Sequence, residues 1–411
     1  MKYRKLSIIA LLVLGLCQVS SCTAEQFDYK MARSDGAAQE DTFYRPAPSD
    51  ATLKNISGIH VRNIILCIGD GMGFNHVALA RHNSVGPGKK LHLERLPVVG
   101  MMRTYSADDL VTDSAAAGTA MACGIKTNNG MIGMDPDKVP HSSILTLLRK
   151  KGWRTGLVAT SQISHATPAA FASHVDSRDK QKEIAVQLLN NRVDVLLGGG
   201  RKYWSEDLLA EAVTAGYEVI GTRDEMAMLK AGPVIGLFAD DGMTTFEPEP
   251  SIGEMAKTAI ALLSLPGREW FSPKPKFFLM IEGSQIDWAA HANDTDRVIR
   301  QTLQFDMAVR EAVGFAQRDK HTLVIVTADH ETGGLVIETE GINKHKIDPD
   351  WEETGHTAAD VPVYAFGPGS EHFAGVIDNT EIPKRIAELT GLQEFPIPRK
   401  RSHMTGQVSI K

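Results

Sequence analysis

Short runs of almost continuously apolar residues recur along the chain. They do not alternate between apolar and polar positions, as a strand with one solvent-facing side would. Four to six such residues in a row are typical of a strand buried on both faces, as in a parallel sheet covered by helices. The runs predicted to be strands are Asn63–Ile68, Thr155–Ala159, Val193–Leu197, Lys276–Ile281, Leu323–Val326 and Val361–Ala365.

Segments with helical spacing of apolar residues lie between these runs. The predicted helices are Ile144–Lys151, Glu183–Asn190, Leu208–Ala215, Ile252–Leu263, Asp296–Arg318 and Ile382–Leu389. Strands that alternate with helices favour an α/β fold, with a mostly parallel central sheet and helices on both faces. Two stretches rich in glycine and proline, Gly232–Ser251 and Gly341–Glu353, are predicted to be surface insertions. We therefore expect one domain over residues 56–396.

The composition of the 411-residue chain is that of a globular protein, with 43% hydrophobic and 23% charged residues. The formal net charge of −6 leaves no general basic surface that could follow a nucleic-acid backbone. Binding to nucleic acid is therefore not expected. One basic cluster, Arg399–Arg401, stands near the C-terminus, and we interpret it as part of a solvated tail over residues 397–411.

The first residues are typical of a bacterial export signal. Three basic residues within the first five precede the apolar run Leu6–Leu16, which is too short to cross a bilayer comfortably. The segment Val19–Cys22 resembles the lipobox of bacterial lipoproteins, in which cleavage precedes the cysteine and lipid is attached to it. We expect a signal peptide over 1–21, a lipid anchor on Cys22 and a tether over 22–55. The protein would then be exported and either periplasmic or membrane-anchored, with later cleavage and free release as the alternative.

Three of the predicted strands end at acidic residues. Asp70 follows the first strand, Glu282 the fourth and Asp329 the fifth. Ligands of open α/β sheets bind outside the carboxyl ends of the strands. A lone aspartate before a glycine is more often a turn residue or a cap than a ligand. Three carboxylates on one edge repel each other unless cations neutralise them, so together they predict a cation site.

Histidines add further candidate metal ligands. Asp287 and His291 are four positions apart, so a helical turn would place both side chains on one face. His330 directly follows Asp329, and mixed histidine and carboxylate ligands suit Zn²⁺. His356 stands alone in a predicted loop, where a histidine is usually a surface residue, so its position carries little weight by itself.

Ser114 is the candidate nucleophile. It lies in the segment Thr112–Ala120, in which small residues after the serine predict the N-terminus of a helix. Backbone N–H groups and the helix dipole favour an anion such as phosphate at that position. From this segment alone, an ordinary capping serine or aspartate is the better explanation.

Seven short motifs, taken together and in chain order, resemble those of the alkaline phosphatases. They are Asp70–Gly73, Thr112–Ala115, His165–Pro168, Arg178, Glu282 with Asp287 and His291, Thr327–Glu331, and Gly355–Thr357. The match extends from about residue 60 to residue 367. The resemblance implies a metal-dependent hydrolase of phosphate monoesters that forms a covalent phosphoserine on Ser114 and releases inorganic phosphate and an alcohol.

The resemblance also implies ligands for three metal ions. A first Zn²⁺ would be held by Asp287, His291 and His356, and a second by Asp70, Asp329, His330 and the Ser114 oxygen. A third ion, usually Mg²⁺, would use Asp70, Thr167 and Glu282, although the nearby His165 could admit Zn²⁺. Arg178 falls where the family places the arginine that binds the phosphate, so Ser114 and Arg178 are the predicted catalytic residues.

Two positions depart from the best-known bacterial pattern of the family. His165 stands where that pattern has aspartate, and Trp288 stands where it has lysine. Both variants occur in other branches of the family. The changes remove an acid from the surroundings of the third metal and a cation from near the phosphate. Because charge-assisted contacts are lost, we expect weaker binding of the third metal and looser binding of phosphate.

Small phosphate monoesters are the expected substrates, and the short segment between His330 and His356 predicts broad acceptance among them. Thr167 and Glu282 favour monoesters, because phosphodiesterases of this fold typically lack the third metal site. Such a phosphodiesterase is the alternative enzyme. A non-catalytic surface lipoprotein that binds phosphate or metal is the alternative from another class. Family members are commonly homodimers, but the sequence identifies no interface.

Overall fold

The computed structural model describes residues 43–266, 275–338, 347 and 349–398. The expected signal peptide, Cys22, most of the basic tail and part of the insertion Gly341–Glu353 lie outside the described residues. The described part of the expected tether packs on the domain. The Tyr44 hydroxyl donates to Asp306 at 2.8 Å, and the Leu53 N–H donates to the Arg95 carbonyl at 2.8 Å.

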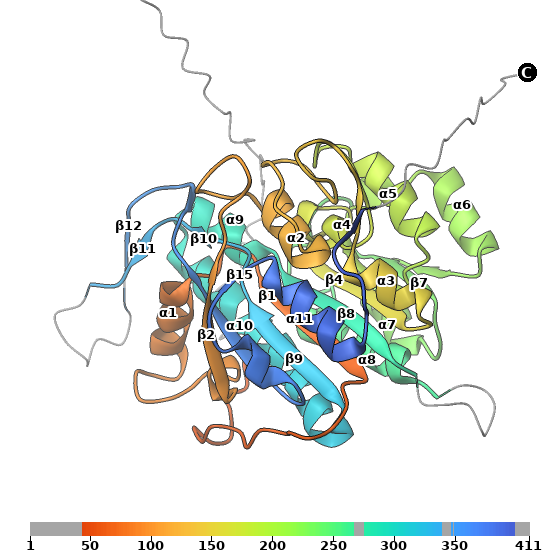
Figure 1. Cartoon of the computed structure of the whole chain (residues 1–411). Helices are drawn as coiled ribbons and strands as arrows, with labels where there is room; N and C mark the ends of the chain where they lie inside the picture. The colour runs from red at the N-terminus through yellow and green to blue at the C-terminus, as the bar shows by residue number, and fades with distance from the viewer. Residues whose placement is uncertain (1–42, 267–274, 339–346, 348, 399–411) are drawn as a thin grey trace, which may run out of the picture. The chain divides into compact units, whose positions relative to one another are not determined.

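A sheet of ten strands forms the centre of the described structure (Figure 1). Its strand order is β15 (Gly375–Asp378), β2 (Val98–Arg103), β14 (Val361–Phe366), β9 (Thr322–Thr327), β1 (Asn63–Gly69), β8 (Phe277–Gly283), β4 (Arg154–Gln162), β5 (Val195–Gly199), β7 (Val234–Leu237) and β6 (Glu218–Ile220). Only β14 among these ten runs antiparallel to its neighbours, β2 and β9. The expected mostly parallel sheet is confirmed, and each of the six predicted runs coincides with one of its strands.

One predicted insertion contains a strand of this sheet. β7 lies within the stretch Gly232–Ser251 and pairs in parallel with both β5 and β6. All four residues of β7 are buried. Gly232 and Pro233 directly precede β7 and Gly236 lies within it, and residues of these types are more typical of turns and loops than of a buried strand. The prediction of a surface excursion is therefore wrong for this part of the stretch.

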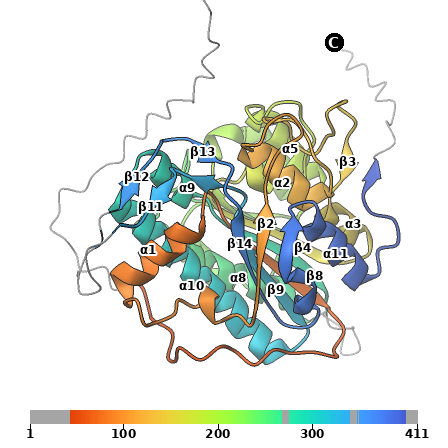
Figure 2. The same cartoon turned by 60° about the vertical axis from the view of Figure 1, so that its left-hand side comes forward.

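Helices cover both faces of the sheet (Figures 1 and 2). One layer consists of α8 (Ile252–Ser264), α10 (Thr295–Asp319) and α1 (Phe74–Ser84), of which α8 and α10 contact the central strands. The other includes α2 (Ser114–Cys123), α3 (Ile144–Lys150), α4 (Ala166–Ala170) and α11 (Glu381–Thr390). Further helices are α5 (Gln181–Asn190), α6 (Glu206–Thr214), α7 (Arg223–Met228) and α9 (Gln285–His291). No helix in the described ranges is long and apolar enough to span a membrane.

Three two-stranded ladders supplement the large sheet. They pair β10 (Glu331–Thr332) with β13 (His356–Thr357), β11 (Leu335–Val336) with β12 (Asp350–Trp351), and β3 (His141–Ser142) with β16 (Ile397–Pro398). The first ladder matters for the site, because it places His356 opposite Thr332.

The register of the parallel strands brings the expected acids to one level. Ile68 on β1 pairs with Glu282 on β8 and with Thr327 on β9. Asp70 and Asp329 each lie two residues beyond these paired positions. The carboxylates that follow separate strands therefore meet at the carboxyl edge of the sheet, where ligands bind in folds of this kind.

Candidate metal centre

Asp70, Asp329 and His330 form one cluster of potential ligands, and all three side chains are fully buried. The His330 Nε2 atom lies 3.4 Å from Asp70 Oδ1 and 3.3 Å from Asp329 Oδ2. The other oxygen of Asp329 accepts hydrogen bonds from the N–H groups of Gly71 and His330, at 3.1 and 3.0 Å. These bonds hold the carboxylate so that Oδ2 faces the cluster.

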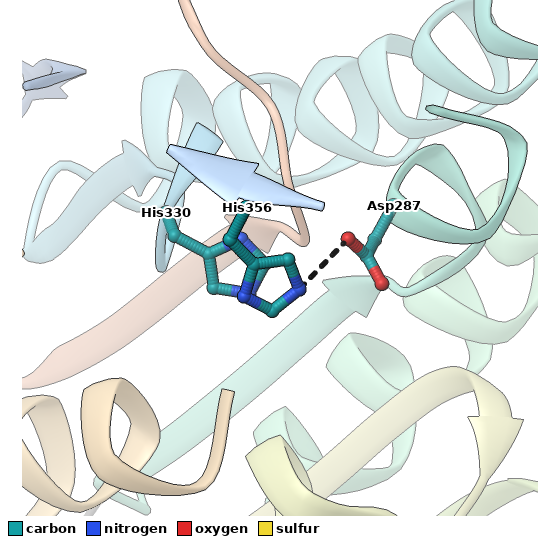
Figure 3. A group of neighbouring side chains, drawn as sticks. All are labelled: Asp287, His330 and His356. Atoms are coloured by element: carbon teal, nitrogen blue, oxygen red, sulfur yellow. Dashed lines mark ion pairs between the residues drawn. The ribbon is translucent and has the colours of Figure 1, made fainter. Parts of the chain in front are cut away.

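Asp287, His291 and His356 form a second cluster. The Nε2 atoms of the two histidines lie 3.3 and 3.5 Å from Asp287 Oδ1 and 3.1 Å from each other. The His330 ring stacks on the His356 ring with 3.6 Å between centroids, and Figure 3 shows both rings beside Asp287. The two clusters are therefore adjacent and share His330 as a neighbour.

Backbone carbonyls orient the histidines of the second cluster. The Nδ1 atom of His356 bonds the Thr112 carbonyl at 2.8 Å, and that of His291 bonds the Thr354 carbonyl. A carbonyl oxygen can only accept, so each Nδ1 carries a proton and Nε2 is the atom that remains for a metal ion. This is the usual arrangement of a metal-binding histidine.

A third cluster contains Asp70, Glu282 and His165, whose ligand atoms lie within 4.8 Å of one another. Asp70 thus belongs to two clusters. Thr167, at the start of α4, is fully buried and lies close enough to Glu282 to influence its pKa. The structure therefore brings together all the residues that the sequence suggested for the three metal ions.

Several buried ligand atoms of these clusters have no hydrogen-bond partner among the described residues. They are both carboxylate oxygens of Asp70, Asp329 Oδ2, Glu282 Oε1, Thr167 Oγ1 and His165 Nδ1. Leaving a buried polar atom unsatisfied costs about 1–3 kcal/mol, and more for a charged group. A native protein concentrates such atoms at one place when something else binds them. The donor set of carboxylate, imidazole and hydroxyl groups fits divalent cations.

The protein alone holds these carboxylates at abnormal pKa values. Burial, reinforced by the charge of Asp287, raises the pKa of Asp329 to about 7, and burial raises that of Glu282 to about 7. Burial and the neighbouring carboxylates also raise the pKa of Asp70. Burial opposes the charge of His291, but Asp287 outweighs it and raises the histidine pKa to about 9. Without cations, the cluster therefore retains protons near neutral pH.

Ser114 begins α2, beside the first cluster. Its Oγ atom lies 3.3 Å from His330 Nε2. Asp113 caps the helix, since its Oδ1 accepts from the Ala116 N–H at 2.9 Å. The segment thus contains both a capping residue and, one position later, a hydroxyl directed at the candidate ligands. The capping explanation applies to Asp113, which leaves the Ser114 hydroxyl for another role.

Arg178 and His165 lie next to this serine-bearing helix. The Arg178 Nη1 atom donates to Asp113 Oδ2 at 3.0 Å, and Nη2 lies 3.1 Å from His165 Nε2. Asp113 outweighs the effect of burial and raises the pKa of Arg178, so the guanidinium stays charged. A fixed planar guanidinium is suited to bidentate binding of phosphate.

Trp288 forms one wall of the third cluster. Its indole ring meets the His165 ring edge-on with 5.9 Å between centroids. The indole also lies against Gly242, where a Cβ atom would be only 2.5 Å from the ring. The glycine is therefore required for the position of the ring, and an apolar surface stands where the best-known family pattern has a cation.

The sequence did not identify Thr332 as a member of the site. Its hydroxyl donates to Asp287 Oδ1 at 2.5 Å and contacts His330 Nδ1 at 3.2 Å, so it links the first two clusters. Gly71 approaches so closely that a Cβ atom would lie 2.7 Å from the Thr332 hydroxyl. The only sequence signal was the position of Thr332 directly after the acidic and histidine motif.

Comparisons with known proteins agree with this geometry. The chain matches the alkaline phosphatase family model over residues 61–349 and 337–392. It is 36% identical to alkaline phosphatase 3 of Bacillus subtilis, over 83% of this chain and 91% of that protein. The solved alkaline phosphatase of the Antarctic bacterium TAB5 is 34% identical, with a TM-score of 0.74 over 82% of this chain and 100% of that one. A histidine-to-aspartate variant of the TAB5 enzyme, 33% identical with a TM-score of 0.72 over 82% and 99%, has Mg bound in its M3 site.

Proposed function

The chain belongs to the alkaline phosphatase family and is a phosphate monoester hydrolase, and we propose that it acts through a covalent phosphoserine on Ser114. The observation that carries this proposal is the position of the Ser114 hydroxyl, 3.3 Å from His330 Nε2 and at the N-terminus of α2. A helix N-terminus stabilises the negative phosphoryl group through its N–H groups and dipole.

The three clusters divide the metal ligands as follows. Asp287, His291 and His356 would hold one Zn²⁺, and Asp70, Asp329, His330 and Ser114 would hold another. Asp70, Thr167 and Glu282 would hold Mg²⁺, with His165 as a neighbour that could admit Zn²⁺. The unpartnered buried oxygens support this assignment. Bound divalent cations supply Lewis-acid chemistry, which offsets the negative charge that develops on the attacking and leaving oxygens.

The residues of the chain then perform a double displacement. The Ser114 oxygen loses its proton and attacks phosphorus, forming a serine–phosphate bond while the ester bond to the alcohol breaks. The departing alcohol oxygen takes up a proton. A water molecule next attacks the same phosphorus and gives up a proton, the serine–phosphate bond breaks, and the Ser114 oxygen takes up a proton, so that free Ser114 and inorganic phosphate result. Splitting the reaction in this way replaces one difficult step with two easier ones.

Arg178 would bind two phosphoryl oxygens throughout these steps. Its guanidinium is held by Asp113 and His165, and it still has N–H groups to donate. A charged, planar donor pair complements the phosphoryl group in both halves of the reaction. Arg178 therefore orients phosphorus for in-line attack by Ser114.

A chromogenic phosphate monoester, assayed beside the matching diester, tests this proposal. We expect hydrolysis of the monoester to dominate and Ser114→Ala to lose at least about a thousandfold in kcat. Wild-type activity in Ser114→Ala would exclude covalent catalysis, and a preference for the diester would favour the alternative phosphodiesterase. Metal analysis of the purified protein should find two Zn²⁺ and one Mg²⁺ per chain.

We also propose that the protein is an exported lipoprotein anchored through Cys22, and that it forms homodimers. The support for export is the apolar run Leu6–Leu16 and the lipobox-like segment that follows it. In a bacterial host, Cys22→Ser should release the protein from the membrane fraction. Retention of the variant in that fraction would exclude a lipid anchor on Cys22. Analytical ultracentrifugation of the soluble domain measures the oligomeric state.

A further inference from the structure

Asn129 and Gly130 form a turn that contacts both predicted catalytic segments. The two residues follow α2 in the chain and are not among the residues assigned to metal or phosphate. Asn129 is exposed to solvent. An exposed asparagine usually contributes little, yet both ends of this side-chain amide are hydrogen-bonded to the segment that precedes Ser114.

The first set of contacts fixes the segment that leads into α2. The Asn129 Oδ1 atom accepts from the Asp113 N–H at 2.9 Å, and its Nδ2 donates to the Val111 carbonyl at 2.9 Å. The Asn129 N–H donates to Asp108 Oδ1 at 2.9 Å. Two bonds of ordinary length thus hold the backbone immediately before the nucleophile, and the third ties Asn129 itself to the Asp108 side chain.

The second set of contacts reaches Arg178. The Gly130 N–H donates to Asp113 Oδ2 at 2.9 Å, and the Gly130 carbonyl accepts from the Arg178 N–H at 2.8 Å. Two residues later, Ile132 and Val175 exchange backbone hydrogen bonds of 2.9 and 3.0 Å. The turn is therefore joined on one side to the segment of Ser114 and on the other to the segment of Arg178.

The backbone of Gly130 allows these contacts. Its φ angle is 83°, in the left-handed region, and the space where a Cβ atom would lie is open. A Cβ atom at this position would have no neighbour within 4 Å, so the conformation, and not the space around Cβ, is what favours glycine. Asparagine is the residue that tolerates this conformation best after glycine.

We propose that the Asn129–Gly130 turn is a positioning element that sets the separation between Ser114 and Arg178, and thereby the fit for a phosphoryl group. This inference rests on the roles proposed above for those two residues. The turn does not touch the substrate. It acts by holding the Asp113 backbone, the Asp113 carboxylate and the Arg178 backbone in one rigid hydrogen-bonded unit.

Four variants test the turn. Asn129→Ala removes the side-chain bonds, and Gly130→Ala strains the backbone without a steric clash. Both should lower kcat/KM for a chromogenic monoester and weaken inhibition by inorganic phosphate, each by about tenfold, because small misplacements of reacting groups are costly. Gly130→Asn should restore most of the activity. Gly152→Ala is the matched control, because Gly152 has φ of 81° and equally open space but precedes the amino end of β4, whereas the site lies at the carboxyl ends of the strands.

A double-mutant cycle with Arg178→Ala separates positioning from general destabilisation. If the turn acts through Arg178, adding Asn129→Ala to the Arg178→Ala variant should lower kcat/KM by less than about twofold. Melting temperatures of all variants should resemble that of Gly152→Ala. The proposal is overturned if Asn129→Ala and Gly130→Ala have the same kcat/KM as Gly152→Ala. It is also overturned if Asn129→Ala lowers kcat/KM by the same factor with and without Arg178.

Failure of the catalytic proposal has a different signature. In that case, Ser114→Ala or Arg178→Ala would retain wild-type activity regardless of the activity of the turn variants. The positioning role of the turn would then be wrong as well, because it rests on the roles of Ser114 and Arg178. If Ser114→Ala and Arg178→Ala are impaired while both turn variants match the control, only the positioning role is wrong.

Discussion

At the scale of single residues, Thr332 is expected to influence metal binding although its side chain binds neither metal nor substrate. Its hydroxyl joins Asp287 and His330, and therefore orients one ligand in each of the first two clusters. Thr332→Val keeps the shape and removes both contacts. Replacing a group that orients a metal ligand typically lowers metal affinity by about tenfold to a hundredfold, so we expect a loss of that size in Thr332→Val. Metal retained after dialysis against graded chelator concentrations measures it.

Thr302→Val provides the control for this change. Thr302 is also fully buried, but its hydroxyl donates only to the Val298 carbonyl within α10, at 2.8 Å. Thr302→Val should lower the stability of the fold slightly and leave the affinity for metal unchanged. Equal metal loss in the two variants would mean that Thr332 acts through packing and not through its hydrogen bonds.

Trp288 allows a second prediction at this scale, because it places an apolar ring where a cation would meet the phosphate. Trp288→Lys should tighten inhibition by inorganic phosphate by about tenfold, since a charge-assisted hydrogen bond contributes about 1.5–3 kcal/mol before the cost of ordering the side chain. Trp288→Met removes the ring without adding charge and should leave phosphate inhibition unchanged or weaker. No tightening in the lysine variant, or equal tightening in both, would refute the electrostatic explanation.

At the scale of elements, α8 begins with a capping box that is independent of the site. The Ser251 hydroxyl accepts from the Glu254 N–H at 3.3 Å, while the Glu254 carboxylate accepts from the Ser251 N–H at 2.9 Å. Ser251→Ala should lower the free energy of unfolding by about 1 kcal/mol and leave kcat unchanged. Chemical denaturation measures the difference. Ser264→Ala, at the other end of the same helix, should lower the free energy of unfolding by less than Ser251→Ala does. An equal decrease in the two variants would contradict the capping role of Ser251.

The elements also show what the sequence could and could not predict. The six longest buried strands were identified because β-strands covered on both faces are apolar at every position. β7 was missed because Gly232 and Pro233 before it and Gly236 within it are typical of loops, whereas the identified runs contain mostly branched apolar residues. The antiparallel direction of β14 was also beyond prediction, since a continuous apolar run looks the same in either direction.

Within the site, prediction was best where the ligands follow strands. Asp70, Glu282 and Asp329 are brought together by the register of adjacent parallel strands, which the alternation of elements already implied. His356 depends instead on the pairing of β13 with β10, two residues on each side. Such short ladders leave no signature in hydrophobic periodicity, so only the family resemblance identified this histidine.

For the molecule as a whole, the metal centre is the main concentration of buried charge among the described residues. Asp70, Glu282, Asp287 and Asp329 all lie within the fold, and each is 5% exposed or less. Burying a charge is expensive unless it is paired. Bound cations would convert this unfavourable set into a stabilising one, so stability should depend on metal and, without metal, on pH.

Glu282 provides the most direct test of that dependence. In the metal-free protein, burial raises its pKa from 4.5 to about 7. Between these values the folded protein binds more protons than the unfolded chain, so this residue makes stability fall as pH rises. In excess chelator, the free energy of unfolding of Glu282→Gln should therefore rise by about 2–3 kcal/mol relative to that of wild type when the pH is raised from 5 to 8. Urea denaturation at each pH measures this difference. Restoring metal should abolish the advantage of the variant at pH 8, because a cation stabilises the carboxylate and not the amide. A difference that stays constant with pH would mean that Glu282 is not protonated in the metal-free fold.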